Sequence, residues 1–297
     1  MPLDQHSTLQ DAHTATSGRF DMKPLTTAIG AEVLGINLGL PLDPHTVTAI
    51  RAAWYDHCVL LFRNQHLDED DQVRFGEYFG RLGTVLNQQR LVEKRHPSIM
   101  FISNIREDGK LIGALPDGEV YWHSDHCFTA NPPAGTMLYA MEIPSSGGNT
   151  MFANMYAAYE ALPRQMKDRL QNLHALNIYD VKGAPAIRLP SPPPDAQSFV
   201  HPVVRVHPVT GRKALYVNRL MTYRIEGISQ SESDELLRYL FDFQEQRKFV
   251  YEHVWTPGDL IIWDNRCSLH ARTDFDAKER RLLRRIVLRE EHQNPTN

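Results

Sequence analysis

Short strand-like segments with helices between them constrain the fold of this chain more than any other feature. Apolar or alternating runs typical of buried strands occur at residues 59–62, 98–103, 136–143, 149–152, 199–206, 213–217, 249–255, 260–263 and 282–289. Patterns typical of helices occur at 46–57, 68–82, 155–173 (with a break at Pro163) and 231–246. Because strands dominate the second half, we predict one β-rich domain, a sandwich or barrel with helical insertions, rather than a doubly wound sheet. Neither a GxGxxG nor a Walker loop is present, so a nucleotide-binding fold is not indicated.

The composition narrows the classes of partner. Among 297 residues, 32 Lys and Arg face 36 Asp and Glu, and the net charge of −4 argues against a duplex nucleic-acid binder. No apolar run reaches the ~20 residues of a membrane helix, and the polar segment 1–19 is expected to be a flexible tail rather than a secretory signal. The three cysteines are widely spaced, which indicates neither a disulfide framework nor a thiolate zinc site. We expect a cytoplasmic protein without nucleic-acid or membrane partners. We also expect a homo-oligomer, either a dimer or a tetramer.

The segment His123-Ser-Asp125 indicates a metal site. Residues i and i+2 of a strand point to the same face, so a strand would present this imidazole and this carboxylate side by side. One more His from a distant strand would complete the two-His-one-carboxylate arrangement of non-haem Fe(II) oxygenases. The candidate is His270, which follows the apolar strand at 260–263.

The chain has 14 histidines, so other residues compete for this role. The alternatives for the third ligand are His201, His207 and His253. His126, next to Asp125, would face the other way on a strand. The segment His66-Leu-Asp68 repeats the motif, but Asp68 begins the acidic start of the helix at 68–82, where Asp serves as an N-cap.

A basic segment at residues 280–289 supplies candidate anion-binding groups. On a strand, Arg281 and Arg285 share one face and lie ~13 Å apart. Arginine binds carboxylates and sulfonates through paired hydrogen bonds, so this face could hold two small anions near one metal. The alternative is a solvated edge strand whose positive charges discourage aggregation.

Together these segments resemble one family, the TauD/TfdA (taurine and 2,4-dichlorophenoxyacetate) Fe(II)/2-oxoglutarate-dependent dioxygenases. The resemblance covers roughly residues 24–290 in order and spacing. Its main segments are WHSDHCF (122–128), PPAGTMLYAMEIPSSGGNT (132–150), WTPGDLIIWDNRCSLH (255–270) and RRLLRR (280–285). The implied fold is a double-stranded β-helix, or jelly roll, with helical insertions. It would make residues 20–297 a single dioxygenase domain.

The resemblance also implies roles for individual residues. His123, Asp125 and His270 match the iron ligands, and Thr150 and Arg281 match the residues that hold the distal carboxylate of 2-oxoglutarate. Arg285 matches the position that meets the acidic group of the substrate. The implied reaction consumes O2, converts 2-oxoglutarate to succinate and CO2, and hydroxylates a C–H bond of a small organic acid. Where that carbon bears an ether oxygen or a sulfonate, C–O or C–S cleavage would follow.

Two departures from the family pattern bear on the substrate. Taurine-using members carry a His shortly after the helix at 68–82, and residues 80–88 contain none. They also carry an Asn shortly before the pair that corresponds to Trp122-His123. The nearest match here is Glu119, which is therefore a candidate substrate-binding residue. The closing segments look more like the aryloxyalkanoate branch. The pocket wall is expected from residues 104–121 and from the proline-rich loop at 182–198, which is either a lid or a surface insertion.

Other classes of function remain open from the sequence. A zinc-dependent hydrolase could use the same His and Asp residues but would need no clamp for 2-oxoglutarate. A non-catalytic jelly-roll binding protein is a further alternative. Within the dioxygenase class, aryloxyalkanoates, other carboxylates, sulfonates and sulfate esters are all candidate substrates, and desaturation or epimerisation is possible as well as hydroxylation.

Overall fold

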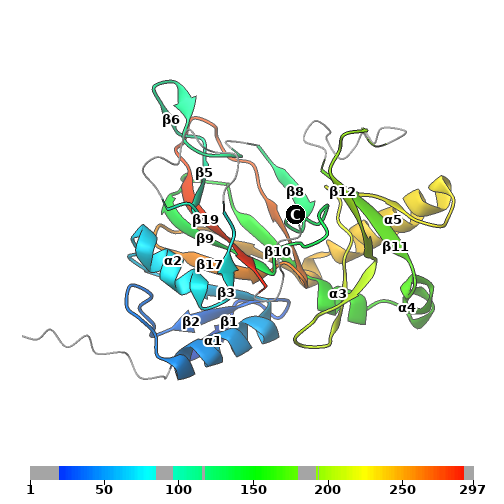
Figure 1. The fold of residues 1–297 in the computed structure, drawn as a ribbon, viewed down its shortest axis with the longest axis horizontal. Coiled ribbons are helices and arrows are strands. Elements are labelled where there is room, and N and C mark those ends of the chain that lie inside the picture. The colour runs from blue at the N-terminus through cyan, green and yellow to red at the C-terminus, as the bar shows by residue number, and fades with distance from the viewer. Residues whose placement is uncertain (1–19, 85–95, 116–117, 180–191, 193, 291–297) are drawn as a thin grey trace, which may run out of the picture.

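Two facing β-sheets form the centre of the protein (Figure 1). The computed structural model describes residues 20–84, 96–115, 118–179, 192 and 194–290, so the expected tail at 1–19 and most of the proline-rich loop at 182–198 lie outside the described residues. The larger sheet contains, in spatial order, β1 (Asp21–Pro24), β2 (Ala31–Leu34), β3 (Val59–Phe62), β17 (Leu260–Asp264), β9 (Gly135–Glu142), β19 (Leu282–Arg289) and β4 (Arg81–Leu82), and β5 (Met100–Ser103) also pairs with β19. The smaller sheet contains β16 (Val250–His253), β10 (Thr150–Asn154), β18 (Ser268–Arg272) and β8 (Val120–His123). The chain passes from one sheet to the other between β9 and β10 and between β17 and β18. The predicted jelly roll is therefore confirmed.

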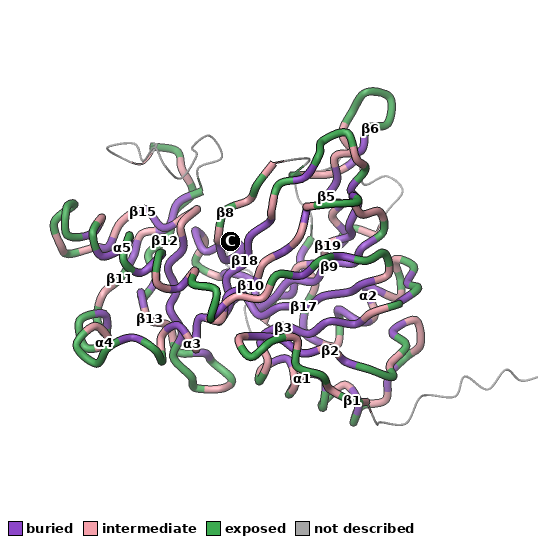
Figure 2. Tube along the Cα trace, turned by 180° about the vertical axis from the view of Figure 1, so that it is seen from behind, coloured by how far each residue is buried: buried purple, intermediate pink, exposed green. Residues whose placement is uncertain are grey.

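The larger sheet is buried on both faces because its strands alternate between two cores. On β9, Leu138 and Ala140 point into the core between the two sheets. Met137 and Tyr139 point into a second core on the other face of the larger sheet. The second core is covered by α1 (Pro44–His57) and α2 (Glu69–Glu77), whose apolar side chains such as Trp54 pack against the sheet. Figure 2 shows the strands of the centre as buried segments, with exposed residues on the outer faces of the helices and on the loops.

A further unit packs beside the sandwich, on the side away from α1 and α2 (Figure 1). It consists of a sheet of β12 (Ser198–Pro202), β11 (His174–Ile178) and β15 (Thr222–Ile225), the pair β13 (Val204–Val206) and β14 (Lys213–Leu215), and the helices α3 (Met155–Glu160), α4 (Arg164–Leu170) and α5 (Gln230–Gln244). The remaining elements are the short pair β6 (Arg106–Glu107) and β7 (Lys110–Leu111) and the 3₁₀ turn at Arg247–Phe249. No helix in the described part of the chain combines the length and the apolar character that crossing a membrane requires.

The local signals explain most of the helix boundaries. Asp43 caps α1 by accepting hydrogen bonds from the backbone N–H groups of His45 and Thr46. Asp68 caps α2 through a capping box with Asp71, which confirms the structural interpretation of His66-Leu-Asp68. The expected break at Pro163 is also confirmed, because α3 ends at Glu160 and α4 begins at Arg164.

The helix predicted at 68–82 is too long. α2 ends at Glu77, and Arg81–Leu82 forms β4 beside the end of β19. Gly80 has a φ of 141°, and a Cβ there would lie 2.4 Å from the carbonyl oxygen of Arg289. The close approach of two backbones at this glycine therefore ends the helix and turns the chain into the sheet.

Candidate active site

Three of the predicted ligands meet on the smaller sheet. His123 ends β8, His270 lies in the middle of β18, and the two residues are direct partners in the antiparallel pairing of these strands. The Nε2 atoms of His270 and His123 lie 3.8 Å and 4.0 Å from Oδ1 of Asp125. The ligand atoms of the three residues all lie within 4.8 Å of one another, and all three residues are buried. One ion could therefore contact all three side chains.

The strand argument for His123 and Asp125 is only half right. β8 ends at His123, and Asp125 lies in the turn that follows. Its carboxylate is held in place by Thr136, whose hydroxyl donates to Oδ2 at 2.6 Å, and by Asn265, whose Nδ2 donates to the same oxygen at 3.4 Å. These contacts direct Oδ1 toward the two histidines. Thr136 and Asn265 were not identified from the sequence, because nothing local distinguishes a supporting Thr or Asn from any other.

Both imidazoles are suited to bind a metal through Nε2. Nδ1 of His123 donates to the carbonyl oxygen of Tyr121 at 2.7 Å, which fixes the tautomer and leaves Nε2 unprotonated. The ring of His270 lies 4.0 Å from that of His123 and 4.7 Å from that of Trp263, measured between centroids. Burial lowers the pKa of His123 and lowers that of His270 well below the usual value, so both rings are neutral at pH 7. Neutral imidazole is the ligating form.

Asp125 is ionised despite its burial. Burial alone would raise the pKa of this carboxyl group, but the nearby charge of Arg285 holds it well below the usual range. Nη2 of Arg285 lies 2.7 Å from Oδ1 of Asp125. The donor set thus combines two neutral nitrogens with one carboxylate oxygen, which suits a first-row divalent metal.

A second group of three such side chains is already saturated. In the cluster of His207, Asp264 and Cys267, Nδ1 of His207 accepts from two backbone N–H groups, and Nε2 lies 3.0 Å from Asp264. Arg266 donates to both carboxylate oxygens of Asp264, at 2.9 Å and 2.6 Å. Burial raises the pKa of the Cys267 thiol, which keeps it protonated. These contacts make the cluster structural.

The other competing histidines are also structural. Nε2 of His201 donates to the carbonyl oxygen of Thr129 at 2.9 Å, and Nε2 of His253 lies 3.1 Å from Asp259. His126 differs from its prediction. The prediction assumed a strand, whereas His126 lies in the turn after Asp125 with a φ of 50°, so the alternation of strand faces does not apply to it.

Arg281 is a buried guanidinium that lacks an anion among the described residues. It is 2% exposed, and the one hydrogen bond of its side chain to a described residue runs from Nη2 to the carbonyl oxygen of Gly148 at 3.1 Å. Its Nε and Nη1 atoms have no partner. Burial, together with the charge of Arg272, lowers the pKa of Arg281 to about 9. A small carboxylate would satisfy both the free donors and the charge.

Thr150 begins β10, two residues after Gly148, and is buried. Its Oγ1 accepts a hydrogen bond from Nε1 of Trp255 at 3.0 Å, which leaves its own hydroxyl proton for another acceptor. The Arg281 side chain thus contacts Gly148, and the Thr150 hydroxyl lies two residues further along the chain. Their groups fit the end of a dicarboxylate.

β19 is an interior strand rather than a solvated edge. It pairs with β9 on one side and with β4 and β5 on the other, which rules out the alternative interpretation of its arginines. Leu283 points into the core between the sheets, whereas Leu282, Ile286 and Leu288 point into the second core, as the alternation predicts. Arg281 and Arg285 flank Leu283, one reaching Gly148 and the other reaching Asp125.

The remaining predicted residue is not brought to this cluster. Glu119 precedes β8, is exposed, and makes no hydrogen bond or ion pair with the described residues. Its contact with a substrate stays a prediction.

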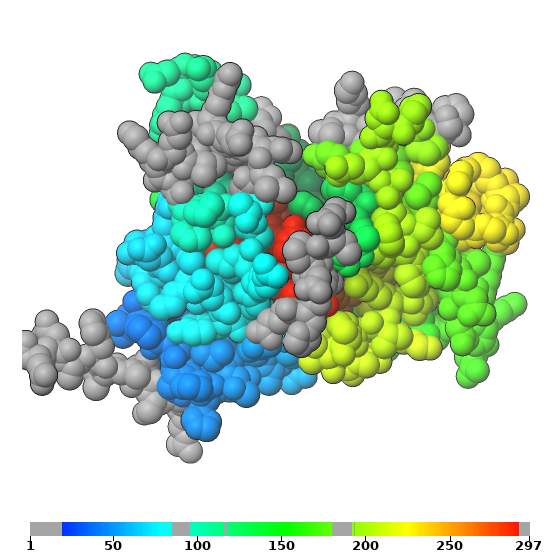
Figure 3. Space-filling view, viewed as in Figure 1, coloured from blue at the N-terminus to red at the C-terminus, as the bar shows by residue number. Residues whose placement is uncertain are grey.

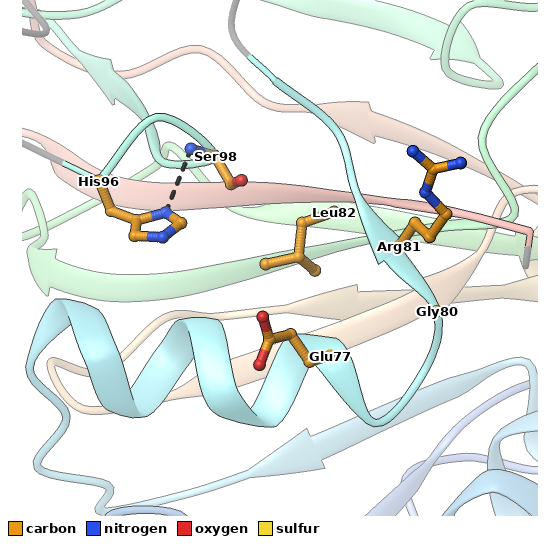
Figure 4. Close-up of a pocket in the computed structure, with 6 residues that line it drawn as sticks. All are labelled: Glu77, Gly80, Arg81, Leu82, His96 and Ser98. Carbon is orange, nitrogen blue, oxygen red and sulfur yellow. Dashed lines mark hydrogen bonds between the residues drawn. The ribbon is translucent and has the colours of Figure 1, made fainter. Parts of the chain in front are cut away.

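A separate pocket of about 500 Å³ opens between α2, β4 and the segment before β5 (Figure 4). It is lined by Glu77, Gly80, Arg81, Leu82, His96 and Ser98. Nδ1 of its single histidine already accepts a hydrogen bond from the N–H of Ser98 at 3.3 Å. None of its lining residues belongs to the cluster described above, so we do not assign the chemistry to it.

A jelly roll that carries two histidines and an aspartate beside a buried arginine defines the α-ketoglutarate-dependent dioxygenases, a class of oxidoreductase. The chain belongs to the TauD/TfdA family within this class, since the family model "Taurine catabolism dioxygenase TauD, TfdA family" matches residues 21–287. The chain is 34% identical to an (S)-phenoxypropionate/alpha-ketoglutarate-dioxygenase of Sphingobium herbicidovorans, over 90% of this chain and 94% of the relative. It is 36% identical to an alpha-ketoglutarate-dependent 2,4-dichlorophenoxyacetate dioxygenase of Cupriavidus pinatubonensis, over 89% of this chain and 96% of the relative. A solved taurine dioxygenase from Burkholderia xenovorans superimposes with a TM-score of 0.78 at 30% identity, covering 91% of this chain and 89% of that one.

These findings decide between the classes left open by the sequence. The family, the fold and the relatives are those of dioxygenases, so the zinc-dependent hydrolase finds no support. The non-catalytic binding protein is likewise wrong, because the chain is a member of an enzyme family.

Proposed function

We propose that this enzyme hydroxylates a C–H bond of a small organic acid, with the acid group bound by Arg285. The contact between Arg285 and Asp125 carries the proposal. It holds a guanidinium that is 12% exposed directly beside the candidate metal site, separate from the buried guanidinium of Arg281. An enzyme with a single anionic ligand would need only one of these two groups. Two such groups, one on β19 and one directly before it, fit a cosubstrate and a substrate that are both anions.

His123, Asp125 and His270 would hold Fe(II) through two Nε2 atoms and one carboxylate oxygen. Thr136 keeps the carboxylate oriented, and the carbonyl of Tyr121 keeps His123 in the tautomer that a metal needs. An iron ion bound there would couple the oxidative decarboxylation of 2-oxoglutarate, to succinate and CO2, to the hydroxylation of the substrate by O2. The replacement of any one ligand would leave the other two too few to hold the ion tightly.

Arg281 and Thr150 would bind the distal carboxylate of 2-oxoglutarate. The Nε and Nη1 atoms of Arg281 are the donors without partners, and the hydroxyl of Thr150 supplies a further one. Because both side chains are buried and fixed, they would set the direction in which the keto acid reaches toward the histidines. Burial also strengthens the charge-assisted hydrogen bonds by excluding water.

Arg285 would orient the substrate. In the substrate-free protein, the carboxylate of Asp125 neutralises part of the charge of Arg285. The acid group of an incoming substrate would bind the same guanidinium alongside Asp125. We propose a carboxylate, sulfonate or sulfate ester as the acid, with aryloxyalkanoates favoured because both named relatives act on aryloxy acids. Hydroxylation of the carbon next to an ether oxygen would give a hemiacetal, which breaks its C–O bond to release a phenol and an oxoacid.

The test is succinate release under air with Fe(II), 2-oxoglutarate and ascorbate, across a panel of aryloxy and aliphatic carboxylates, sulfonates and alkyl sulfates. We expect at least one acid to stimulate succinate formation and to yield a hydroxylated or cleaved product. The Arg285→Gln variant should raise the KM for that acid by about 100-fold, because it removes a charged hydrogen-bond donor from a largely buried site. Its KM for 2-oxoglutarate should stay close to that of the wild type. The proposal fails if no acid of the panel stimulates succinate release, or if the product is a desaturated or epimerised acid.

A further inference from the structure

His126 is held in a strained turn directly after Asp125. Its φ of 50° lies in the left-handed region, which His adopts more readily than most residues. The turn is fixed by Thr129, whose N–H and Oγ1 both donate to the carbonyl oxygen of His126, at 3.0 Å and 2.9 Å. Nε2 of His201 in turn donates to the carbonyl oxygen of Thr129 at 2.9 Å. The fold thus maintains an unfavourable backbone conformation beside the metal site, which is typical of positions with a functional constraint.

The imidazole of His126 is near the charged groups of the site but is bonded to none of them. Burial lowers its pKa, the charge of Asp125 raises it, and the charges of Arg285 and Arg289 lower it further. Both arginines belong to β19. Neither ring nitrogen makes a hydrogen bond to any described residue. A partly buried imidazole with both nitrogens free, next to the proposed acid-binding guanidinium, is available to a ligand.

Two further rings pack in succession onto the ring of His126. The rings of His126 and Phe128 are stacked, with centroids 5.5 Å apart and planes at 20°. The ring of Tyr179 lies 4.7 Å from that of Phe128. We call these three rings the aromatic wall. Figure 3 shows a hollow between the half of the molecule that carries α2 and the half that carries β11 to β15, with red atoms of β19 visible in it.

We propose that His126 is a substrate-contacting residue and that the aromatic wall accepts a flat ring attached to the acid bound by Arg285. His126, the wall residue next to Asp125, would then select aromatic acids over aliphatic acids of the same charge and length. The contacts of aromatic rings with one another are worth more than the buried area alone, which gives the wall its preference. This inference depends on the proposed function, because it takes Arg285 as the anchor of the acid.

The test compares phenoxyacetate with butoxyacetate, which share the ether oxygen and the carboxylate but differ in the ring. Binding is measured by calorimetry on the protein loaded with Mn(II) and N-oxalylglycine, an unreactive analogue of 2-oxoglutarate, and KM and kcat are measured by succinate release. We expect the wild type to prefer phenoxyacetate by about tenfold in both Kd and KM. The His126→Asn variant should lose most of this preference while its Kd for butoxyacetate changes less than about twofold. Asn is chosen because it tolerates a positive φ, so the turn is preserved.

Two further variants separate contact from structure. Phe128→Leu should also reduce the preference for phenoxyacetate over butoxyacetate, since it removes the second ring of the aromatic wall. His174→Asn is the matched control, because His174 is exposed on β11 and should leave both acids unaffected. The inference is overturned if His126→Asn weakens the binding of both acids equally or leaves the ratio of their Kd values unchanged. It is also overturned if the wild type binds neither acid, or binds both with the same Kd. Succinate release with any other acid of the panel would in each case leave the proposed function standing.

Discussion

The unpaired charge of Arg281 leads to a prediction in which one substitution stabilises the protein and disables its cosubstrate site. In Arg281→Met, a neutral chain of similar length replaces a guanidinium that is 2% exposed. The fall in the pKa of Arg281 from the usual arginine value to about 9 corresponds to about 5 kcal/mol against the charged form. Because this pKa is lowered in the folded state, the penalty is fully present below pH 9 and is relieved only as the pH rises through 9 toward the usual arginine pKa. At pH 7.5 it therefore acts in full.

The substitution also removes one favourable contact. The carbonyl of Gly148 loses its donor at 3.1 Å, which costs about 1–3 kcal/mol when the group stays buried. The difference leaves the variant about 2–4 kcal/mol more stable than the wild type without cosubstrate, in line with other replacements of buried charges by apolar groups. For a chain of this size that is a rise in Tm of roughly 3–6 °C.

The affinity for 2-oxoglutarate should move in the opposite direction. Removing one partner of a buried, hydrogen-bonded charge pair costs about 2–5 kcal/mol, so the Kd should rise between about 30-fold and several thousandfold. The assay is thermal unfolding at pH 7.5 with Mn(II) present, with and without 2-oxoglutarate, supported by calorimetric titration. The cosubstrate should raise the Tm of the wild type and leave that of the variant unchanged.

Arg280→Met is the matched control, because Arg280 forms an exposed ion pair with Glu142. It should leave both the unfolding temperature and the cosubstrate affinity close to those of the wild type. The reasoning is refuted if Arg281→Met unfolds at a lower temperature than the wild type without cosubstrate, or if it binds 2-oxoglutarate as tightly.

Three further substitutions test other parts of the site and its support. Asp125→Ala should weaken Mn(II) binding by at least about 100-fold in a titration and abolish succinate release; retained turnover would remove Asp125 from the ligand set. Thr150→Val should weaken 2-oxoglutarate binding by about five- to tenfold, the value of one hydrogen bond, and an unchanged Kd would contradict its assigned contact. Asp264, which Arg266 and His207 keep ionised against the effect of burial, has a pKa lowered to about 2. The stabilisation that ionised Asp264 gives to the folded state is thus complete above pH 4 and is lost as the pH falls toward 2. The free energy of unfolding of the wild type, measured in urea, should therefore fall by about 2 kcal/mol over this range, and that of Asp264→Asn should not show this fall.

The sequence predicts those parts of the fold whose residues carry a local signal. β17 and β19 were predictable because apolar side chains on both faces make them central strands, and α1 and α2 were predictable from their capping residues. Other strands carry no such signal. β1 and β2 pair with each other at the edge of the larger sheet, and β1 is mostly exposed, so neither reads as a buried strand.

The same distinction holds for the site. The residues that occupy it could be proposed from motif spacing and family resemblance, but the means by which they are held could not. Asp125 is positioned by Thr136 and Asn265, which come from other strands and turns. The direction of His126 depends on a left-handed φ that the strand pattern of its neighbours does not predict. Contacts of this kind arise from tertiary packing, and a single sequence contains no local trace of them.

The placement of the site across two sheets has a consequence for how such an enzyme diversifies. The candidate metal ligands belong to β8, β18 and the turn between β8 and β9, whereas Arg285 belongs to β19 in the opposite sheet and Arg281 directly precedes that strand. The candidate metal ligands and the arginine that we propose to bind the acid group of the substrate are thus carried by different strands. A substitution at Arg285 would then change which acids bind while the residues that would hold the metal stay in place. A lineage with this architecture can acquire a new nutrient without first losing its reaction.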